Sequence, residues 1–264
     1  MNVSFDVHDG PAGAETVLLS SGLGGAAGYW APQLDALRQH YRVVAYDQAG
    51  TGRNRGELPS THSIAAMADE AAALLDASGT DKAHFVGHAL GGLVGLALAQ
   101  RRPDRLSSLT VVNGWAAAHT HTRRCFDVRL SLLAHEGPAA YVKAQPIFLY
   151  PADWLAANEA RVAQEEAHGL AGFQGSHNLK ARIAALLAFD ARPGLAAIKL
   201  PTFIVAARDD VLVPSTMSEA LAAGIPGARL HVAPWGAHAI NVTEPTAFNA
   251  LLLDFLTCAT PKAS

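Results

Sequence analysis

Cysteine, charge and long apolar runs are all scarce in this sequence. Only two of the 264 residues are cysteines, Cys125 and Cys258, which predicts a reduced, cytoplasmic protein whose thiols are buried or inert. Charged residues make up 16% and the net charge is −3, so the basic surface typical of nucleic-acid or anionic-membrane binding is missing. The apolar stretches are short, and residues 1–20 lack the pattern of a secretory signal. We therefore expect no membrane or nucleic-acid partner.

Half of the residues are apolar, which is ample for a single large core. Short runs rich in Val, Ile and Leu alternate with longer segments of helical period, a pattern typical of a parallel sheet flanked by helices. Strands are predicted at 16–20, 42–47, 83–88, 109–113, 202–207 and 228–233. Helices are predicted at 30–39, 64–78, 89–101, 215–223 and 245–257. The sequence thus indicates an α/β fold built on a mostly parallel, twisted sheet.

The turn at residues 87–91, between a predicted strand and a predicted helix, matches a catalytic motif except at one residue. Residues 87–91 read Gly-His-Ala-Leu-Gly, which is the G-x-S-x-G nucleophile elbow of α/β-hydrolases with Ala89 in the place of serine. An apolar strand leads into the turn and a helix of small residues leaves it, as the elbow requires. The small residues suit a strained turn with strand and helix packed closely behind it. A hydrolase with this elbow has to work without the usual covalent step.

The segment 116–200 differs from the rest of the chain because strand signals vanish in it. It is helical and amphipathic, with irregular connections that contain proline and glycine. In the α/β-hydrolase fold an insertion after the sixth strand forms a helical cap over the active site. We therefore expect a core made of residues 1–115 and 201–264, and a cap made of residues 116–200.

An acid and a histidine follow the elbow in the order that the fold demands, which is nucleophile, acid, histidine. Asp210 lies after the next-to-last predicted strand and four residues before Pro214, and is preferred over Asp209, which we expect to be solvated or salt-bridged. His238 lies in the loop after the last strand, between small residues. The catalytic candidates are therefore His238, Asp210 and the elbow position Ala89.

Two backbone N–H groups are candidates for the oxyanion hole. They are those of Leu90, directly after the elbow position, and of Leu23 in the glycine-rich loop 20–25. The alternative, a phosphate-binding loop, lacks the G-x-G-x-x-G spacing and an acidic ribose partner. His88, beside the elbow, is expected to have a structural role behind it. The turn 46–52 is expected to support the elbow.

Metal ligands are not evident among the twelve histidines. The pair His84 and His88 falls on a predicted strand rather than on one helix face, and the pair His119 and His121 has no cysteine or further partner. We therefore predict no metal and no cofactor.

The whole chain resembles the RutD family, α/β-hydrolases of bacterial pyrimidine (uracil) degradation. The stretches that carry the resemblance are 21–25, 46–48, 86–91, 113–115, 121–126, 145–154 and 238–243. The cap stretches 121–126 and 145–154 are the most specific of these. The resemblance implies a C–N hydrolase (an aminohydrolase) that converts carbamate to ammonia and carbon dioxide, or 3-aminoacrylate to malonic semialdehyde. It also implies that an alanine elbow is native to the family, whereas Ala49 stands where arginine is common.

These residues suggest a mechanism in which His238, oriented by Asp210, activates a water held beside Ala89. Arg123 or Arg124 is then a candidate for binding the substrate carboxylate, with His121 and Trp115 as further substrate-binding candidates.

Two other interpretations remain open. One is a serine esterase or C–C hydrolase whose serine was replaced by alanine through engineering, and the other is a small-ligand binder without turnover. The sequence leaves the choice of substrate and the oligomeric state undetermined.

Overall fold

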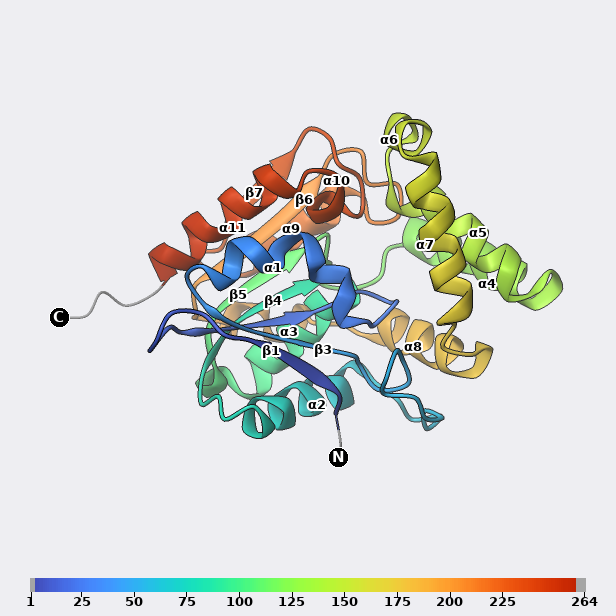
Figure 1. The fold of residues 1–264 in the computed structure, drawn as a ribbon. Coiled ribbons are helices and arrows are strands. Elements are labelled where there is room, and N and C mark those ends of the chain that lie inside the picture. The colour runs from blue at the N-terminus through green and yellow to red at the C-terminus, as the bar shows by residue number, and fades with distance from the viewer. Residues whose placement is uncertain (1–2, 260–264) are drawn as a thin grey trace.

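The computed structural model describes residues 3–259. They form a seven-stranded sheet in the order β1-β3-β2-β4-β5-β6-β7, in which only β1 runs antiparallel to its neighbour (Figure 1). The strands are β1 Phe5–His8, β2 Thr16–Ser20, β3 Arg42–Tyr46, β4 Ala83–His88, β5 Leu106–Val112, β6 Thr202–Ala207 and β7 Arg229–Ala233. The parallel strands β2, β4 and β6 are buried along their whole length, as expected for strands covered on both faces.

Helices cover both faces of the sheet. The core helices are α1 Ala31–Arg38, α2 Ile64–Ala77, α3 Leu90–Arg101, α9 Ser215–Gly224, α10 Ile240–Thr243 and α11 Pro245–Ala259. Successive strand residues serve opposite faces, so that Phe85 of β4 packs with α2 and α3 while Val86 packs with α1 and α11. This sandwich of helices around a parallel sheet is the predicted α/β architecture.

The structure differs from the predicted elements at two strands. Strand β1 is missing from the prediction because its four residues, at the edge of the sheet, are only partly buried and include Asp6 and His8. Strand β5 starts at Leu106 rather than at residue 109. The polar residue that hid this start, Ser108, is fully buried, and its hydroxyl is hydrogen-bonded to Nδ1 of His84 at 2.8 Å.

The insertion forms five helices, α4 Thr120–His135, α5 Gly137–Leu149, α6 Ala152–Ala157, α7 Glu159–Ala171 and α8 Ser176–Ala188. They gather at one end of the sheet, green to yellow in Figure 1. The insertion lies between β5 and β6. By this chain's own count it follows the fifth strand rather than the sixth, because the described sheet has seven strands.

The two cysteines are free, as predicted, but they differ in environment. Cys125 of α4 is buried, whereas Cys258 of α11 is exposed, so that burial, one of the two expected states, applies to Cys125 alone. Within residues 3–259 no helix is long and apolar enough to cross a bilayer.

Candidate active site

The elbow is a sharp turn between β4 and α3. Ala89 has φ +46° and ψ −111°, a backbone conformation that is strained for any residue with a side chain. Glycine is required on both sides of it, since a Cβ on Gly87 would lie 2.3 Å from the carbonyl oxygen of Gly91, and one on Gly91 would lie 2.1 Å from that of Ser20. The turn therefore presents the short side chain of Ala89 at the carboxyl end of β4, with the N-terminus of α3 beginning at Leu90.

His238 and Asp210 form a buried dyad. Nδ1 of His238 lies 2.7 Å from Oδ2 of Asp210, and because a carboxylate only accepts, Nδ1 carries the proton. The other carboxylate oxygen accepts the N–H groups of Leu212 and Val213, each at 2.8 Å. This tautomer leaves Nε2 of His238 unprotonated and available as a base.

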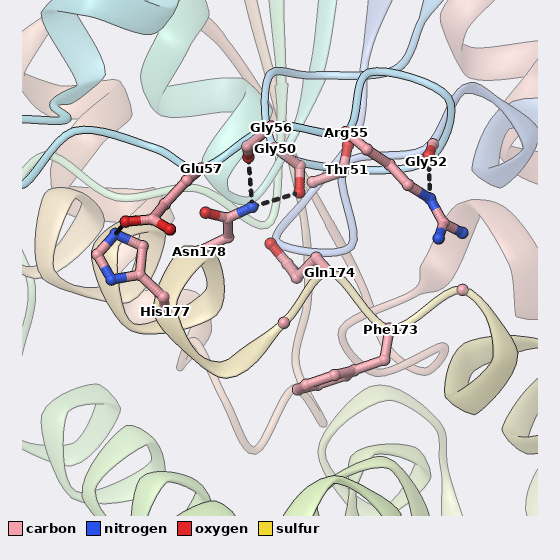
Figure 2. Close-up of a pocket in the computed structure, with 12 residues that line it drawn as sticks. Gly50, Thr51, Gly52, Arg55, Gly56, Glu57, Phe173, Gln174, His177 and Asn178 are labelled. Atoms are coloured by element: carbon pink, nitrogen blue, oxygen red, sulfur yellow. Dashed lines mark hydrogen bonds and ion pairs between the residues drawn. The ribbon is translucent and has the colours of Figure 1, made fainter.

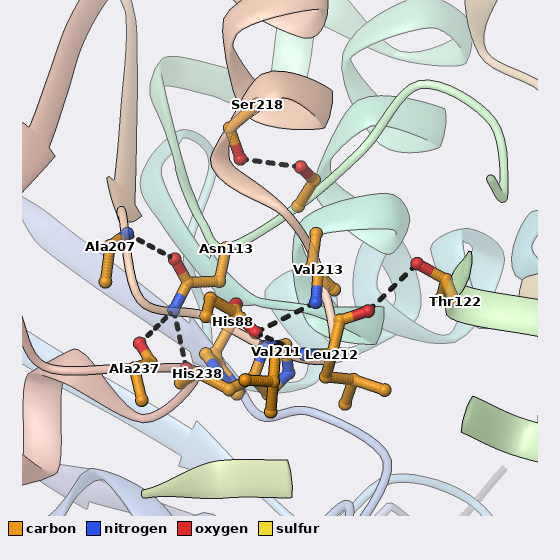
Figure 3. A network of polar contacts seen from close by, with 12 residues as sticks. His88, Asn113, Thr122, Ala207, Val211, Leu212, Val213, Ser218, Ala237 and His238 are labelled. Atoms are coloured by element: carbon orange, nitrogen blue, oxygen red, sulfur yellow. Dashed lines mark hydrogen bonds and ion pairs between the residues drawn. The ribbon is translucent and has the colours of Figure 1, made fainter. Parts of the chain in front are cut away.

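Asn113, at the end of β5, holds the histidine loop in place (Figure 3). Its Nδ2 donates to the carbonyls of Ala237 and His238 at 3.0 and 2.6 Å, and its Oδ1 accepts the N–H of Ala207 at 3.1 Å. Asn113 and Ala237 have φ +48° and +51°, and with Ala89 they are the three non-glycine residues of positive φ in the described chain. Strain concentrated at one place is typical of functional sites.

Asp209 also supports this loop, in contrast to the expectation of a solvated or salt-bridged residue. Its carboxylate accepts the N–H of Ala237 at 2.9 Å and the N–H of Gly236 at 3.3 Å. Of the two adjacent aspartates, Asp210 thus orients the imidazole and Asp209 orients the backbone that carries it.

His88 lies between two rings rather than behind the elbow. Its Nε2 donates to the carbonyl of His238 at 2.8 Å, and its ring centroid lies 4.8 Å from those of both Tyr29 and His238. Burial, and secondarily the neighbouring His238, lowers the pKa of His88 to about 3. A neutral His88 therefore places no positive charge next to His238. Tyr29, which donates to Asn241 Oδ1 at 2.8 Å, was not predicted.

The oxyanion candidates differ in how they are oriented. Leu90 N–H belongs to the first turn of α3, whose N–H groups have no partner within the helix. Leu23 N–H shares its trans peptide with the carbonyl of Gly22, which accepts from Nη2 of Arg182 at 3.5 Å. The Leu23 carbonyl accepts from the same nitrogen at 3.3 Å and from Gln174 at 3.2 Å. Arg182, a fully buried residue of cap helix α8, therefore orients this loop and was not predicted.

The loop around Asp47 has its ion pair despite alanine at position 49. Burial opposes ionisation of Asp47, but hydrogen bonds from Arg53 and from the N–H of Ala27 lower the pKa of its carboxyl below the usual value. Nε of Arg53 lies 2.8 Å from Oδ2 of Asp47. The N–H of Ala49 is bound by the buried carboxyl of Glu70 at 2.8 Å.

The four predicted substrate-binding residues lie in different environments. Arg123 and Arg124 are exposed on α4, and Arg123 donates to a backbone carbonyl of α8 at 2.7 Å. His121 is exposed and donates from Nε2 to the carbonyl of Val211 at 2.6 Å. Trp115 is buried, and its Nε1 has no hydrogen-bond partner among residues 3–259. The structure thus brings only Trp115 into the buried interior, and leaves both arginines in contact with solvent.

A cavity of about 350 Å³ opens where the core loop 50–57 faces residues 172–178 of the cap, which are a loop and the first turn of α8 (Figure 2). Asn178 bridges the two loops, since its Nδ2 donates to the carbonyls of Gly50 and Gly56 at 3.1 and 2.8 Å. The residues that line it include neither the dyad nor the elbow. Within residues 3–259, no group of three or more His, Cys, Asp or Glu side chains is placed to hold a metal ion.

Comparison with known proteins supports the fold described above. The family model of the alpha/beta hydrolase fold matches residues 15–245. A curated relative from Caulobacter sp. (strain K31), named "Putative carbamate hydrolase RutD", is 52% identical and the match covers 95% of this chain and 94% of the relative. A relative of the same name from Variovorax paradoxus (strain S110) is 54% identical, with 97% and 96% covered. This chain belongs to the RutD family.

Solved structures of related hydrolases share the whole fold. The enol-lactonase from Burkholderia xenovorans LB400 superposes with a TM-score of 0.87 at 27% identity, covering 97% of this chain and 96% of its own. A hydrolase from Pseudomonas aeruginosa PA01 gives a TM-score of 0.86 at 31% identity, covering 96% and 94%. Family and fold together identify the protein as a hydrolase of the α/β-hydrolase class.

Proposed function

We propose that the protein hydrolyses the C–N bond of a small, labile, amine-bearing acid, either carbamate or 3-aminoacrylate, in pyrimidine catabolism. The observation that carries the proposal is a buried, oriented base next to an elbow that has no nucleophile. His238 is bonded to Asp210 at 2.7 Å, and its ring lies 4.8 Å from that of His88, the residue before Ala89 at the turn. The names of the RutD relatives support the carbamate alternative.

In the proposed reaction a water molecule replaces the serine hydroxyl. Alanine lacks one oxygen, which leaves room for a water near the polar imidazole. With carbamate, Nε2 of His238 takes a proton from this water as its oxygen bonds to the carboxyl carbon, and the N–H groups of Leu23 and Leu90 bind the oxygen that gains charge. The imidazolium returns the proton to the nitrogen as the C–N bond breaks, which gives ammonia and bicarbonate, the hydrated form of carbon dioxide.

With 3-aminoacrylate, the water oxygen bonds to C3 and the imidazolium delivers the water proton to C2, where the electron pair of the C=C bond receives it. Nε2 then takes the proton of the new hydroxyl and passes it to the nitrogen as the C–N bond breaks, which gives malonic semialdehyde and ammonia. One water is consumed and one ammonia is released for either substrate.

The size of these effects explains why only labile substrates suit the site. General-base catalysis contributes about 10²- to 10⁴-fold, and one oxyanion donor about 10²- to 10³-fold. These factors accelerate a reaction that already proceeds unaided. They do not cleave an amide bond, which needs a much larger enhancement.

The test is ammonia release from freshly generated 3-aminoacrylate and from carbamate, measured for the wild type and for His238→Ala. We expect the wild type to accelerate one of them and the variant to lose that acceleration, because only His238 supplies the base. No acceleration of either substrate by the wild type would refute the proposal and favour a binding protein.

A second variant separates the proposal from a serine hydrolase. If the native chemistry used a serine, Ala89→Ser would raise ester hydrolysis by many orders of magnitude. We expect instead that Ala89→Ser lowers ammonia release, because its hydroxyl occupies the place of the water.

A further inference from the structure

Arg129 is a buried cation without a counter-ion. It lies on α4 with 2% of its surface exposed, and its guanidinium carbon lies 5.1 to 5.4 Å from the ring centroids of Phe126, Tyr141 and Phe148. No carboxylate of residues 3–259 is within 4 Å of it. A buried charge is costly unless it is paired, so an unpaired arginine among aromatic rings calls for an explanation.

The donors of this side chain are only partly used. Nη2 donates to the hydroxyl of Tyr141 at 2.7 Å and to Oε1 of Gln145 at 3.1 Å. Nε is fully buried and has no hydrogen-bond partner among the described residues. Tyr141 accepts in its bond with Arg129, so its own proton is free to be donated. The Nε–H group and the Tyr141 hydroxyl are therefore two donors without an acceptor among the described residues.

The first turns of α4 lie on the loop that carries the acid of the dyad. Thr122 donates from Oγ1 to the carbonyl of Leu212 at 2.9 Å (Figure 3), and the thiol of Cys125 lies 3.7 Å from the carbonyl of Val211. Arg129 follows Cys125 by four residues, which puts both on the same face of the helix.

The elements that surround Arg129 also contact the loop that carries His238 and the glycine-rich loop 20–25. Phe148 precedes Leu149, whose carbonyl accepts the N–H of Ala239, beside the histidine base, at 3.0 Å. The ring of Tyr141 lies 6.4 Å from that of Phe173. Phe173 precedes the glutamine that donates to the oxyanion loop. The guanidinium is thus enclosed by cap segments that rest on all three catalytic loops.

We propose that Arg129 and Tyr141 bind the carboxylate of a short organic acid at the roof of the active site. The assignment to a substrate carboxylate rests on the function proposed above and applies to 3-aminoacrylate, because the carboxyl carbon of carbamate is itself the reacting carbon. The carboxylate supplies the counter-ion that the described chain lacks, and it accepts from Nε of Arg129 and from the hydroxyl of Tyr141. Charge-assisted hydrogen bonds of this kind are stronger away from water, which favours Arg129 over the exposed Arg123 and Arg124.

The anion site is tested without turnover, with two unreactive three-carbon probes of the same shape. Propionate carries the carboxylate, and propionamide is its neutral counterpart. We expect the wild type to bind propionate more tightly in a ligand-detected NMR titration, and Arg129→Gln to weaken propionate by about 10- to 100-fold while changing propionamide by less than about threefold. Lys143→Gln, which removes an exposed charge from neighbouring α5, serves as the control and leaves both affinities unchanged.

Three results would overturn the site. They are equal binding of the two probes by the wild type, an equal loss of both probes in Arg129→Gln, and a loss of propionate in Arg124→Gln with none in Arg129→Gln. Tyr141→Phe gives an independent readout should Arg129→Gln not fold, because it removes one hydroxyl only. We expect it to weaken propionate by about 3- to 10-fold and to leave propionamide unchanged; unchanged propionate binding would contradict the site.

Turnover distinguishes failure of the site from failure of the proposed function. Ammonia release from 3-aminoacrylate by the wild type that is unaltered in Arg129→Gln would remove the site and leave the hydrolase intact. Selective propionate binding through Arg129, with no ammonia released from either candidate substrate, would remove the proposed reaction and leave the anion site in place.

Discussion

Replacing Asn113 tests how much of the stability of the histidine loop depends on one side chain. Its amide makes three hydrogen bonds to backbone groups, two in the histidine loop and one at the end of β6, and is fully buried. Asn113→Gly removes all three bonds but tolerates the φ of +48°. Asn113→Ala removes the same bonds and adds the strain of a Cβ in the left-handed region.

The expected loss follows from which groups are left unpaired. The carbonyl of Ala237 and the N–H of Ala207 lose the bonds that Asn113 provides, while the carbonyl of His238 keeps its bond from His88. A buried polar group left without a partner costs about 1 to 3 kcal/mol. We therefore expect Asn113→Gly to lower the free energy of unfolding by about 2 to 6 kcal/mol, and Asn113→Ala by about 1 kcal/mol more.

Urea-induced unfolding followed by tryptophan fluorescence measures this loss, provided that the slope with denaturant stays constant. A loss below about 1 kcal/mol in Asn113→Gly would refute the reasoning, because it would mean that water or a rearranged loop replaces the amide. Ammonia release provides a second check, since a loosened loop no longer fixes His238, and the rate should fall even at temperatures where the variant remains folded.

Three further predictions concern buried ionisable groups. Arg182→Met removes the cation that binds the carbonyls on both sides of Leu23 N–H. It should lower the rate of ammonia release about 10²-fold, with a smaller effect on KM. An unchanged rate would show that the peptide is held without Arg182. Burial raises the pKa of Glu70 to about 7, so the folded state binds this proton more tightly than the unfolded state, and the free energy of unfolding should fall by about 3 kcal/mol as pH rises from 4.5 through 7. Glu70→Gln should remove that fall in urea titrations at pH 5 and pH 8, and a fall of the same size in the variant would contradict the assignment. Burial lowers the pKa of His88 to about 3 in the folded state, so the free energy of unfolding is highest above pH 6.5 and falls by roughly 4 to 5 kcal/mol as pH falls to 3. His88→Gln keeps a donor for the His238 carbonyl and should move the midpoint of acid unfolding to lower pH. A midpoint at the same or a higher pH would count against this assignment.

Local sequence patterns predict most of the fold and, in the candidate site, the elbow with Asp210 and His238. The elbow is visible in the sequence because the tight turn leaves no room for a Cβ at its glycines. Asp210 and His238 can be selected because the fold fixes the order of acid and histidine along the chain. Strand β1 escaped prediction because an edge strand is only half buried and does not need an apolar pattern.

Arg129, Arg182 and Asp209 could not be found in the same way. Their hydrogen bonds reach residues of other elements, from 12 positions away for Arg129 and Tyr141 to 160 positions away for Arg182 and Gly22. Nothing in the neighbourhood of an arginine in a helical segment distinguishes a buried guanidinium from a solvated one. Arg123, Arg124 and Arg129 lie within seven residues, yet only Arg129 is buried.

The reach of Arg182 from α8 into the glycine-rich loop has a consequence for engineering. Here the cap contributes a cation that orients a peptide of the core, through the carbonyls of Gly22 and Leu23. A chimaera with a foreign cap would therefore lose reaction rate as well as selectivity, unless the donor helix brought an arginine at the same place. If the proposed function holds, a change of cap therefore alters the reaction rate together with the choice of substrate.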